Sequence, residues 1–404
     1  MKLLFVNIAY PKEIYQQLRD DAQGILQASC DVLQWAVIDG LEQNGIDYTL
    51  ATVPALPAWP RYKHLFTPEG EMMVNGKPRG HYLSYCDAPA VKQLSQRRVL
   101  RNYISRWCNA NHNEDCLAVL TYTQHVEILG AAIDLKKDFL NLVVVPIITD
   151  LIEDALDFAS NRTFLKRLQV KIEAKAERNM FPKVDKFVLL TSQMTERIPE
   201  ALGKYLVVEG IATLKEKGAQ PVFKAEQPRT LLYTGVLEDY AGIRLLVDAF
   251  MNVNRSDIQL IICGSGSDEA YVRRAMASDP RIDFRGRVDR EEAVKLQREC
   301  TLLINPRQPN GGITKYSFPS KTMEYMTSGT PMIGYHLEGI PKEYYEYMYS
   351  PCDLSKASLT ECIYNALLLS DEDLKEKARK AYEFVTQKKN SKEQVKRIIN
   401  FMMK

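Results

Sequence analysis

The sequence predicts an α/β protein built from two Rossmann-like domains. At 404 residues it exceeds what one hydrophobic core normally supports, so two domains are expected. Short apolar runs alternate with helical patterns twice along the chain, and a lysine-rich stretch with Gly and Pro separates the two series. This alternation is typical of doubly wound sheets of parallel strands.

The first series opens with a strand, a helix and a second strand. Residues 3–8 form a short apolar run, residues 24–44 repeat apolar side chains at helical spacing, and residues 48–53 are again strand-like. Residues 54–87 are rich in Pro, Gly and aromatic side chains without clear periodicity, so we expect an insertion that lies over a cleft or carries specificity. The remaining strands are expected at 117–122, 142–148 and 186–190.

The second series begins after a linker at residues 209–229. Its strands are expected at 231–234, 258–263, 282–284 and 301–305, and its helices at 242–252, 269–277 and 290–299. The last helical stretch, 371–403, is longer than this domain needs, and a break near Lys389 predicts that its end crosses back to the first domain. We therefore assign residues 1–208 and 386–404 to an N-terminal domain and residues 230–385 to a C-terminal domain.

Composition narrows the class of protein. With 53 basic and 51 acidic side chains, the formal net charge of +2 argues against a nucleic-acid binder that relies on bulk charge. The eight cysteines form no C-x-x-C pair and have no histidine at metal-ligand spacing, so we expect reduced thiols and no metal site. The N-terminus is typical of a buried first strand, and no apolar stretch approaches the length that spans a bilayer. These features predict a cytoplasmic protein.

The most informative segment is residues 317–331, in which a helix follows directly after a loop. The first N–H groups of a helix lack intrahelical acceptors and carry partial positive charge, so this turn can hold a diphosphate. Lys321 adds a full cation, and Glu324, one turn further on the same face, can accept both hydroxyls of a ribose. The alternative is an ordinary capped helix. The turn itself consists of Ser317, Phe318, Pro319 and Ser320.

With this segment, the chain resembles the retaining GT-B glycosyltransferases of group 1 (family 4-like), most closely over residues 231–402. In that family an E-x7-E segment opens this helix, and its second Glu holds the nucleotide ribose while the first contacts the donor sugar. Glu324 matches the second position, whereas Tyr316 occupies the first and offers a phenolic hydroxyl instead. The resemblance implies two facing Rossmann-like domains, an N-terminal acceptor domain and a C-terminal nucleotide-sugar donor domain.

The chain departs from the family again after the first strand of the C-terminal domain. The family places an Arg and a Lys there, five residues apart, and both hold the diphosphate; this chain has Val236 and Ala241, after Gly235. Because the leaving diphosphate gains negative charge, other cations are needed, and we hypothesise that Arg307 and Lys321 substitute. Arg307 follows a strand whose carboxyl end should face the ligand crevice. The alternative is that Arg307 only caps a loop.

Two glycines and one turn complete the expected donor site. Gly264 and Gly266 follow a strand but lack the third glycine of the dinucleotide fingerprint, which argues against NAD. In the resembled family this strand end lines the nucleotide pocket, and the turn with Arg287 and Val288 corresponds to its base-contacting turn. The alternative for Arg287 is a solvated surface arginine.

The resemblance is looser in the N-terminal half. Asp150 follows the strand at 142–148 and is expected to orient the acceptor hydroxyl or act as a base, with helix N-capping as the alternative. His125 lies where some relatives place a histidine against the donor sugar, although a lone histidine is often structural. Gly24 is expected to open the first long helix and to bring its backbone close to the donor phosphates.

The resemblance implies transfer of a hexose from a nucleotide-diphosphate donor, UDP rather than GDP, to an acceptor hydroxyl with retention. The expected setting is cell-surface polysaccharide or glycoconjugate assembly, with a glycan or lipid-linked acceptor and no cofactor. No metal is expected, because Asp371 and Asp373 form a D-x-D but follow Ser370 as the first turn of a helix. The alternatives are a sugar-nucleotide epimerase, since the GT-B fold also serves epimerases, and a catalytically silent subunit.

Two clusters of basic residues, around Arg97 and Lys171, lie in the N-terminal half. Such clusters favour peripheral contact with an anionic membrane, here at the inner face of the membrane. Two solvated helix faces are the alternative.

Overall fold

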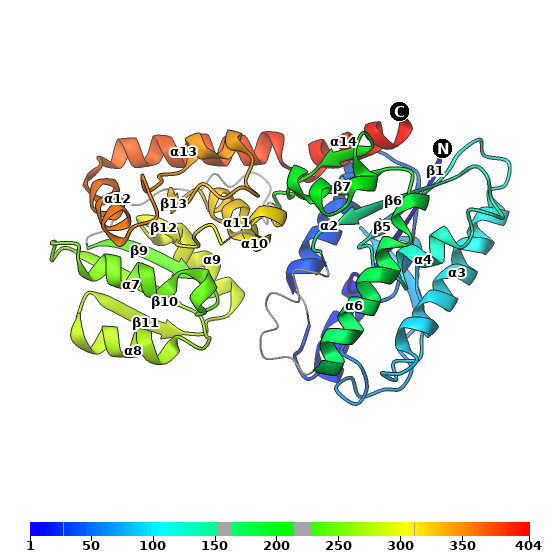
Figure 1. Ribbon diagram of the computed structural model, residues 1–404, viewed down its shortest axis with the longest axis horizontal. Coiled ribbons are helices and arrows are strands. Elements are labelled where there is room, and N and C mark those ends of the chain that lie inside the picture. The colour runs from blue at the N-terminus through cyan, green and yellow to red at the C-terminus, as the bar shows by residue number, and fades with distance from the viewer. Residues whose placement is uncertain (27, 152–163, 214–227, 311) are drawn as a thin grey trace. The chain divides into compact units, whose positions relative to one another are not determined.

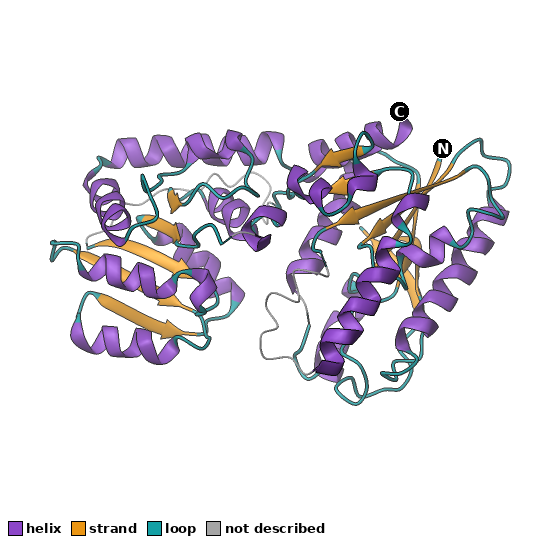
Figure 2. Cartoon of the chain, viewed as in Figure 1, coloured by secondary structure: helices purple, strands orange, loops and turns teal. Residues whose placement is uncertain are grey.

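The computed structural model describes residues 1–404 except 27, 152–163, 214–227 and 311 (Figure 1). The chain divides into two compact units: unit 1 comprises Met1–Ile211 with Ser391–Lys404, and unit 2 comprises Ala212–Asn390. Each unit holds one sheet with helices packed against it (Figure 2). Most of the expected linker at 209–229 lies outside the described residues.

Unit 1 contains an eight-stranded sheet in the order β3-β4-β2-β1-β5-β6-β7-β8. Neighbouring strands are parallel except for the antiparallel pair β3 and β4. The central strand β5 is buried along its whole length, as its apolar run predicts for a sheet covered on both faces. The strands are β1 (Lys2–Asn7), β2 (Tyr48–Thr52), β3 (Gly70–Val74), β4 (Lys77–Tyr82), β5 (Leu117–Tyr122), β6 (Leu142–Ile148), β7 (Phe187–Leu189) and β8 (Tyr205–Val207).

Residues 54–87 contain two strands that are not expected from the sequence. They contain the hairpin of β3 and β4, and β4 pairs parallel to β2, so this segment extends the edge of the sheet. Asn75 and Gly76 form its turn with positive φ angles of 51° and 74°, a conformation that Asn and Gly tolerate. These strands are not predicted by the sequence, because Gly70, Gly80 and Pro78 interrupt the alternation of apolar and polar side chains.

Unit 1 also contains six described α-helices, of which α2 and α14 pack against each other, as do α3 and α4 (Figure 1). Gly40 allows the close approach of α2 to α14, because a Cβ atom there would lie 2.3 Å from the carbonyl oxygen of Ser391. The helices are α1 (Tyr15–Asp21), α2 (Ala28–Gln43), α3 (Lys92–Ala110), α4 (Leu129–Ile133), α6 (Phe164–Arg178) and α14 (Ser391–Met403).

Unit 2 contains a five-stranded parallel sheet in the order β11-β10-β9-β12-β13. The chain starts in the middle strand and leaves it to both sides, which is doubly wound topology. The strands are β9 (Arg229–Thr234), β10 (Ile258–Cys263), β11 (Ile282–Gly286), β12 (Leu302–Asn305) and β13 (Met332–Gly334). The α-helices are α7 (Ile243–Met251), α8 (Glu269–Ser278), α9 (Arg290–Glu299), α10 (Gly312–Tyr316), α11 (Ser320–Ser328), α12 (Lys356–Leu368) and α13 (Asp371–Lys388).

The last two helices belong to different units. Helix α13 ends at Lys388, and α14 begins at Ser391 and packs on α2 of unit 1. The predicted return of the chain end to the N-terminal half is therefore confirmed. At the start of α13, the Ser370 side chain accepts a hydrogen bond from the Asp373 N–H, so the D-x-D does lie in a capped first turn. Among the described residues, we find no helix with both the length and the apolarity needed to cross a bilayer.

Candidate functional site

The candidate donor site lies at the carboxyl edge of the unit 2 sheet. Since β9, β10, β11 and β12 are parallel, the residues that follow them collect at one edge. Open α/β sheets bind ligands at this edge. Gly235 follows β9, Gly264 follows β10 and Arg307 follows β12 by two residues, so three of the residues expected from the sequence meet there.

The loops after β9 and β10 are pressed together through glycine. A Cβ atom on Gly264 would lie 1.7 Å from the carbonyl oxygen of Gly235, and one on Gly266 would lie 2.3 Å from that of Leu237. The Gly264 N–H also donates to the carbonyl of Gly286 at the end of β11 (2.8 Å). Glycine at these positions therefore allows the two loops to pack backbone against backbone.

Helix α11 begins at this edge without a side-chain cap. Pro319 is its N-cap residue and supplies no side-chain hydrogen bond, and Ser320, the first helical residue, is exposed. The Thr322 hydroxyl in the first turn is buried and has no hydrogen-bond partner. The first N–H groups of a helix and the positive end of its dipole favour an anion, so this turn suits a phosphate.

Two cations, Arg307 and Lys321, lie beside this helix start. Neither forms an ion pair within the part of the chain that the structure describes, and Arg307 Nε is buried without a hydrogen-bond partner. Burial lowers the pKa of each side chain. For Lys321, the negative charge of Glu324 raises the pKa and the positive charge of Arg307 lowers it. A partly buried cation that lacks an ion pair is a suitable partner for an anionic ligand.

Both cations reach the loop in which the resembled family carries its own Arg and Lys. Lys321 Nζ lies 2.6 Å from where a Cβ atom on Gly235 would stand. The Arg307 guanidinium carbon is 5.8 Å from the ring centre of Tyr240, and Gly242 packs on the Pro306 carbonyl beside it. Positive charge therefore surrounds the 235–242 loop although Val236 and Ala241 carry none.

Glu324 is exposed, and a buried hydrogen-bond network holds its carboxylate. Gln297 Nε2 donates to Glu324 Oε1 (2.7 Å) and to Thr234 Oγ1 (3.0 Å), and the Tyr325 hydroxyl lies 3.3 Å from Thr234 Oγ1. The backbone of Gln297 is also held in place, because the Thr330 hydroxyl donates a hydrogen bond to the Gln297 backbone carbonyl (2.6 Å). Gln297 is not among the residues expected from the sequence; the available signal was an amide on the buried face of the helix at 290–299.

The other residues expected at the donor site differ in how far their side chains are exposed. The Phe318 side chain lies in the hydrophobic core with its ring centre 5.4 Å from that of Tyr344, so a donor on this turn would meet mainly the Phe318 backbone. Tyr316 is 7% exposed, which leaves little of its ring available. Val288 packs against the core, whereas Arg287 is exposed.

A second group of expected residues meets at the carboxyl edge of the unit 1 sheet. His125 follows β5 and Asp150 follows the adjacent strand β6, close enough for the charge of His125 to lower the pKa of Asp150. Desolvation has the largest effect on that carboxyl and raises its pKa, although Asp150 is exposed. The Gln124 side chain donates to the Asp150 carbonyl (2.6 Å), which fixes the two loops to each other.

His125 is not a lone histidine. Its Nδ1 lies 3.2 Å from Oε1 of Glu177 on α6, a carboxylate that is 3% exposed. Glu177 is not among the residues expected from the sequence, because 52 residues separate it from His125 and no local pattern connects them. Thr123, two residues before His125, has a φ of +82°, which is strained for a β-branched residue. Strain of this kind persists where the surrounding structure and function require it.

The pKa of His125 provides a test of this pair. Burial by itself lowers it, but the hydrogen bond to Glu177 and nearby carboxylates raise it above its ordinary value of 6.5. In an NMR pH titration, the His125 ring should therefore titrate above 6.5. Glu177→Gln should lower the pKa of His125, because it removes the carboxylate that raises this pKa and leaves the effect of burial, which lowers it. The exposed His112 serves as the reference, and a His125 pKa that is insensitive to the substitution would contradict the pairing. His125 then stabilises the fold fully below pH 6.5 and loses this contribution as the pH rises through its raised pKa.

The expected start of the first long helix at Gly24 requires a correction. Helix α2 begins at Ala28, and Gly24 instead ends the turn after α1, where its N–H donates to the Arg19 carbonyl (2.8 Å). Gly24 has a φ of +77° in this turn, a conformation in which glycine is favoured. A Cβ atom there would meet nothing within 4 Å, so Gly24 borders open space.

Comparison with known proteins relates unit 2 to a family. Residues 228–367 match the family described as Glycosyl transferases group 1. Over 108 residues, the chain is 30% identical to the D-rhamnosyltransferase WbpZ of Pseudomonas aeruginosa, a match that covers 26% of this chain and 26% of that relative. The sequence of unit 2 is thus similar to that of glycosyltransferases of group 1.

Solved structures resemble the chain over its full length. Sucrose-phosphate synthase from Thermosynechococcus elongatus has a TM-score of 0.65 at 15% identity, with 100% of this chain and 98% of that chain covered. Anabaena Alr3699/HepE in complex with UDP has a TM-score of 0.56 at 14% identity, with 100% of both chains covered. At these identities the likeness concerns the fold, and it identifies the predicted GT-B fold.

Proposed function

We propose that this chain is a glycosyltransferase that moves a hexose from a nucleotide-diphosphate donor, UDP rather than GDP, to an acceptor hydroxyl with retention at the anomeric carbon. The observation that carries the proposal is the pair of partly buried cations, Arg307 and Lys321, beside an uncapped helix start and the exposed Glu324. The relation of unit 2 to group 1 glycosyltransferases supports the same activity.

In this proposal, the β- and α-phosphates of the donor lie on the first turn of α11 between Arg307 and Lys321. As the bond between the anomeric carbon and the phosphate oxygen breaks, the departing diphosphate gains negative charge. Fixed cations in a site of low dielectric stabilise this charge without reorganisation. Glu324, held by Gln297, accepts hydrogen bonds from the ribose hydroxyls, and the glycine-lined loops after β9 and β10 receive the nucleoside.

The unit 1 residues are proposed to act on the acceptor and on the transferred sugar. Asp150 orients the acceptor hydroxyl or accepts its proton as the new bond to the anomeric carbon forms. His125, positioned by Glu177, donates a hydrogen bond to the donor sugar. Neither role requires a cofactor.

Helix α6 supports contact with an anionic membrane during polysaccharide or glycoconjugate assembly. Leu168 and Ile172, one turn apart, expose 45% and 61% of their surface, and the basic residues Lys171 and Lys175 are also exposed. An amphipathic helix of this composition favours an anionic lipid surface. A glycan on a lipid carrier would then be the acceptor.

Calorimetric titration of UDP and GDP into the purified chain tests the donor assignment. UDP should bind, and incubation with UDP-sugars and a glycan acceptor should release UDP. If UDP binds but no sugar is transferred or epimerised, the chain is a silent GT-B subunit, which Tyr316 in place of the family glutamate favours. If neither nucleotide binds at concentrations up to roughly 10 mM, the donor proposal is wrong.

Transfer should not depend on a divalent cation. Arg307 and Lys321 already supply two positive charges to the diphosphate, and the D-x-D at Asp371 is committed to a helix start and to an ion pair with Arg229 (2.8 Å). Turnover measured in EDTA should equal turnover in Mg²⁺ within about twofold, given that loss of a required metal abolishes activity. Complete loss in EDTA that Mg²⁺ restores would contradict this expectation.

A further inference from the structure

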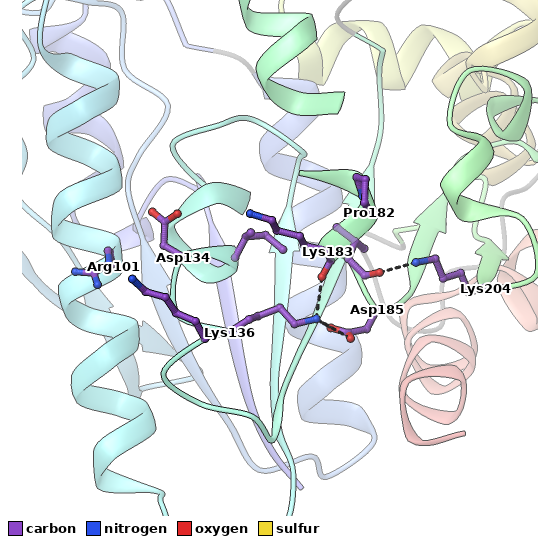
Figure 3. A pocket seen from close by; sticks show the side chains of 10 residues that line it. Arg101, Asp134, Lys136, Pro182, Lys183, Asp185 and Lys204 are labelled. Atoms are coloured by element: carbon purple, nitrogen blue, oxygen red, sulfur yellow. Dashed lines mark hydrogen bonds and ion pairs between the residues drawn. The ribbon is translucent and has the colours of Figure 1, made fainter. Parts of the chain in front are cut away.

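A basic pocket lies at the opposite edge of the unit 1 sheet from His125 and Asp150. Its walls include Lys136 from the loop between α4 and β6, Asp185 just before β7 and Lys204 just before β8, so it opens at the amino ends of these strands (Figure 3). Strand β6 (Leu142–Ile148) connects the two edges and spans about 20 Å at roughly 3.3 Å per residue. The pocket is therefore separate from the candidate acceptor site.

Positive charge dominates the pocket. Five basic side chains line it against two acidic ones, around a cavity of about 830 Å³. Both acidic residues already have partners: Asp134 binds Arg97 (2.8 Å), and Asp185 binds Lys136 (2.6 Å). The negative charges inside the pocket are thus neutralised by two cations, one of which, Arg97, is not among the lining residues.

Of the other four basic side chains that line the pocket, only Arg101 forms an ion pair among the described residues. Lys137 and Lys183 are exposed and form no ion pair with any residue that the structure describes. Lys204 donates to the backbone carbonyl of Val184 (2.7 Å), which leaves its charge uncompensated, and Arg101 is 3.8 Å from Asp138. Three cations without an ion pair among the described residues, Lys137, Lys183 and Lys204, thus line one cavity, an arrangement whose field concentrates anions.

The rest of the wall indicates the kind of anion. Ile133 and Val184 contribute apolar surface, and none of the described residues that line the pocket is aromatic. A nucleobase would find no ring to stack on, whereas a phosphate needs only several cationic donors. The lysines suit a phosphate as point charges from different segments, namely the loop after α4, the end of η2 (Phe181–Lys183) and the loop before β8.

We propose that this pocket binds a phosphate group, either of a soluble phosphorylated ligand or of an anionic lipid headgroup. Its position about 20 Å from the candidate acceptor site gives it a role in holding or anchoring a ligand rather than in the transfer reaction. The proposal does not depend on the donor assignment, because it uses residues of unit 1 only.

The test is charge reversal at Lys137→Glu/Lys183→Glu in the full chain. Both lysines are exposed and lack partners, so the double variant should fold normally, with an unchanged Tm. The matched control is Lys392→Glu/Lys396→Glu, which makes the same charge change on exposed lysines of α14 in the same unit. One arm measures binding of inorganic phosphate by calorimetry, and the other measures sedimentation with vesicles of phosphatidylglycerol and phosphatidylcholine against vesicles of phosphatidylcholine alone.

We expect wild type and control to bind in at least one arm and the double variant to bind at least about tenfold more weakly. Loss in the vesicle arm identifies a lipid headgroup as the source of the phosphate, and loss in the phosphate arm alone identifies a soluble ligand. Phosphate held at Arg307 and Lys321 would be unaffected by the double variant, which separates the two sites. Equal binding by the double variant and the control, or no binding by wild type in either arm, would overturn the proposal.

Discussion

Lys321→Ala should lower the turnover number for sugar transfer by about 10²–10³, because the Lys321 cation faces the charge that develops on the departing diphosphate. Arg307→Ala should lower the turnover number by a slightly smaller factor for the same reason. The same variants should not unfold more easily than wild type. Both side chains are largely buried without a counter-ion, so their removal eliminates a desolvation cost instead of an ion pair. Loss of turnover at equal or higher Tm would distinguish a catalytic role from a structural one.

Lys295→Ala is the matched control for Lys321→Ala. Lys295 is an exposed lysine on α9 of the same unit, and its removal changes the net charge by the same amount. Turnover should remain within about twofold of wild type, because a solvated charge is screened from the site. Near-normal turnover of both Arg307→Ala and Lys321→Ala would show that other groups stabilise the leaving group.

Glu324→Ala should weaken UDP binding by at least about tenfold, since a hydrogen bond to a charged acceptor contributes on the order of 1.5–3 kcal/mol. The ribose contact can be identified with 2′-deoxy-UDP. Wild type should discriminate strongly between UDP and 2′-deoxy-UDP, because a site built to bind a hydroxyl rejects the analogue that lacks it. Glu324→Ala should bind both nucleotides with similar, weak affinity, as measured by calorimetry.

Glu299→Ala provides the comparison for Glu324→Ala. Glu299 is an exposed carboxylate at the end of α9 and should have no effect on either nucleotide. If Glu324→Ala retains the preference of wild type for UDP over 2′-deoxy-UDP, the carboxylate does not contact the 2′-hydroxyl. The Gln297 network would then have only a structural role.

Several features of the fold followed from local sequence alone. The apolar runs at 117–122 and 142–148 coincide with β5 and β6, and the break near Lys389 coincides with the gap between α13 and α14. The hairpin of β3 and β4 was missed because its two strands lack the alternation that marks a strand, and only pairing with β2 and with each other defines them.

The sequence by itself determined the two-domain α/β architecture and the helix that places Lys321 three residues before Glu324. These properties depend on periodicity and spacing, which are local. The tertiary structure alone decided that Lys321 reaches Gly235, that Arg307 lies beside Tyr240, and which side chain, Gln297, holds Glu324. The reason is topological: β9 lies between β10 and β12 in the sheet, so residues from distant parts of the chain meet at one edge. The pairing of His125 with Glu177 was likewise decided by the packing of α6, which no local pattern reveals.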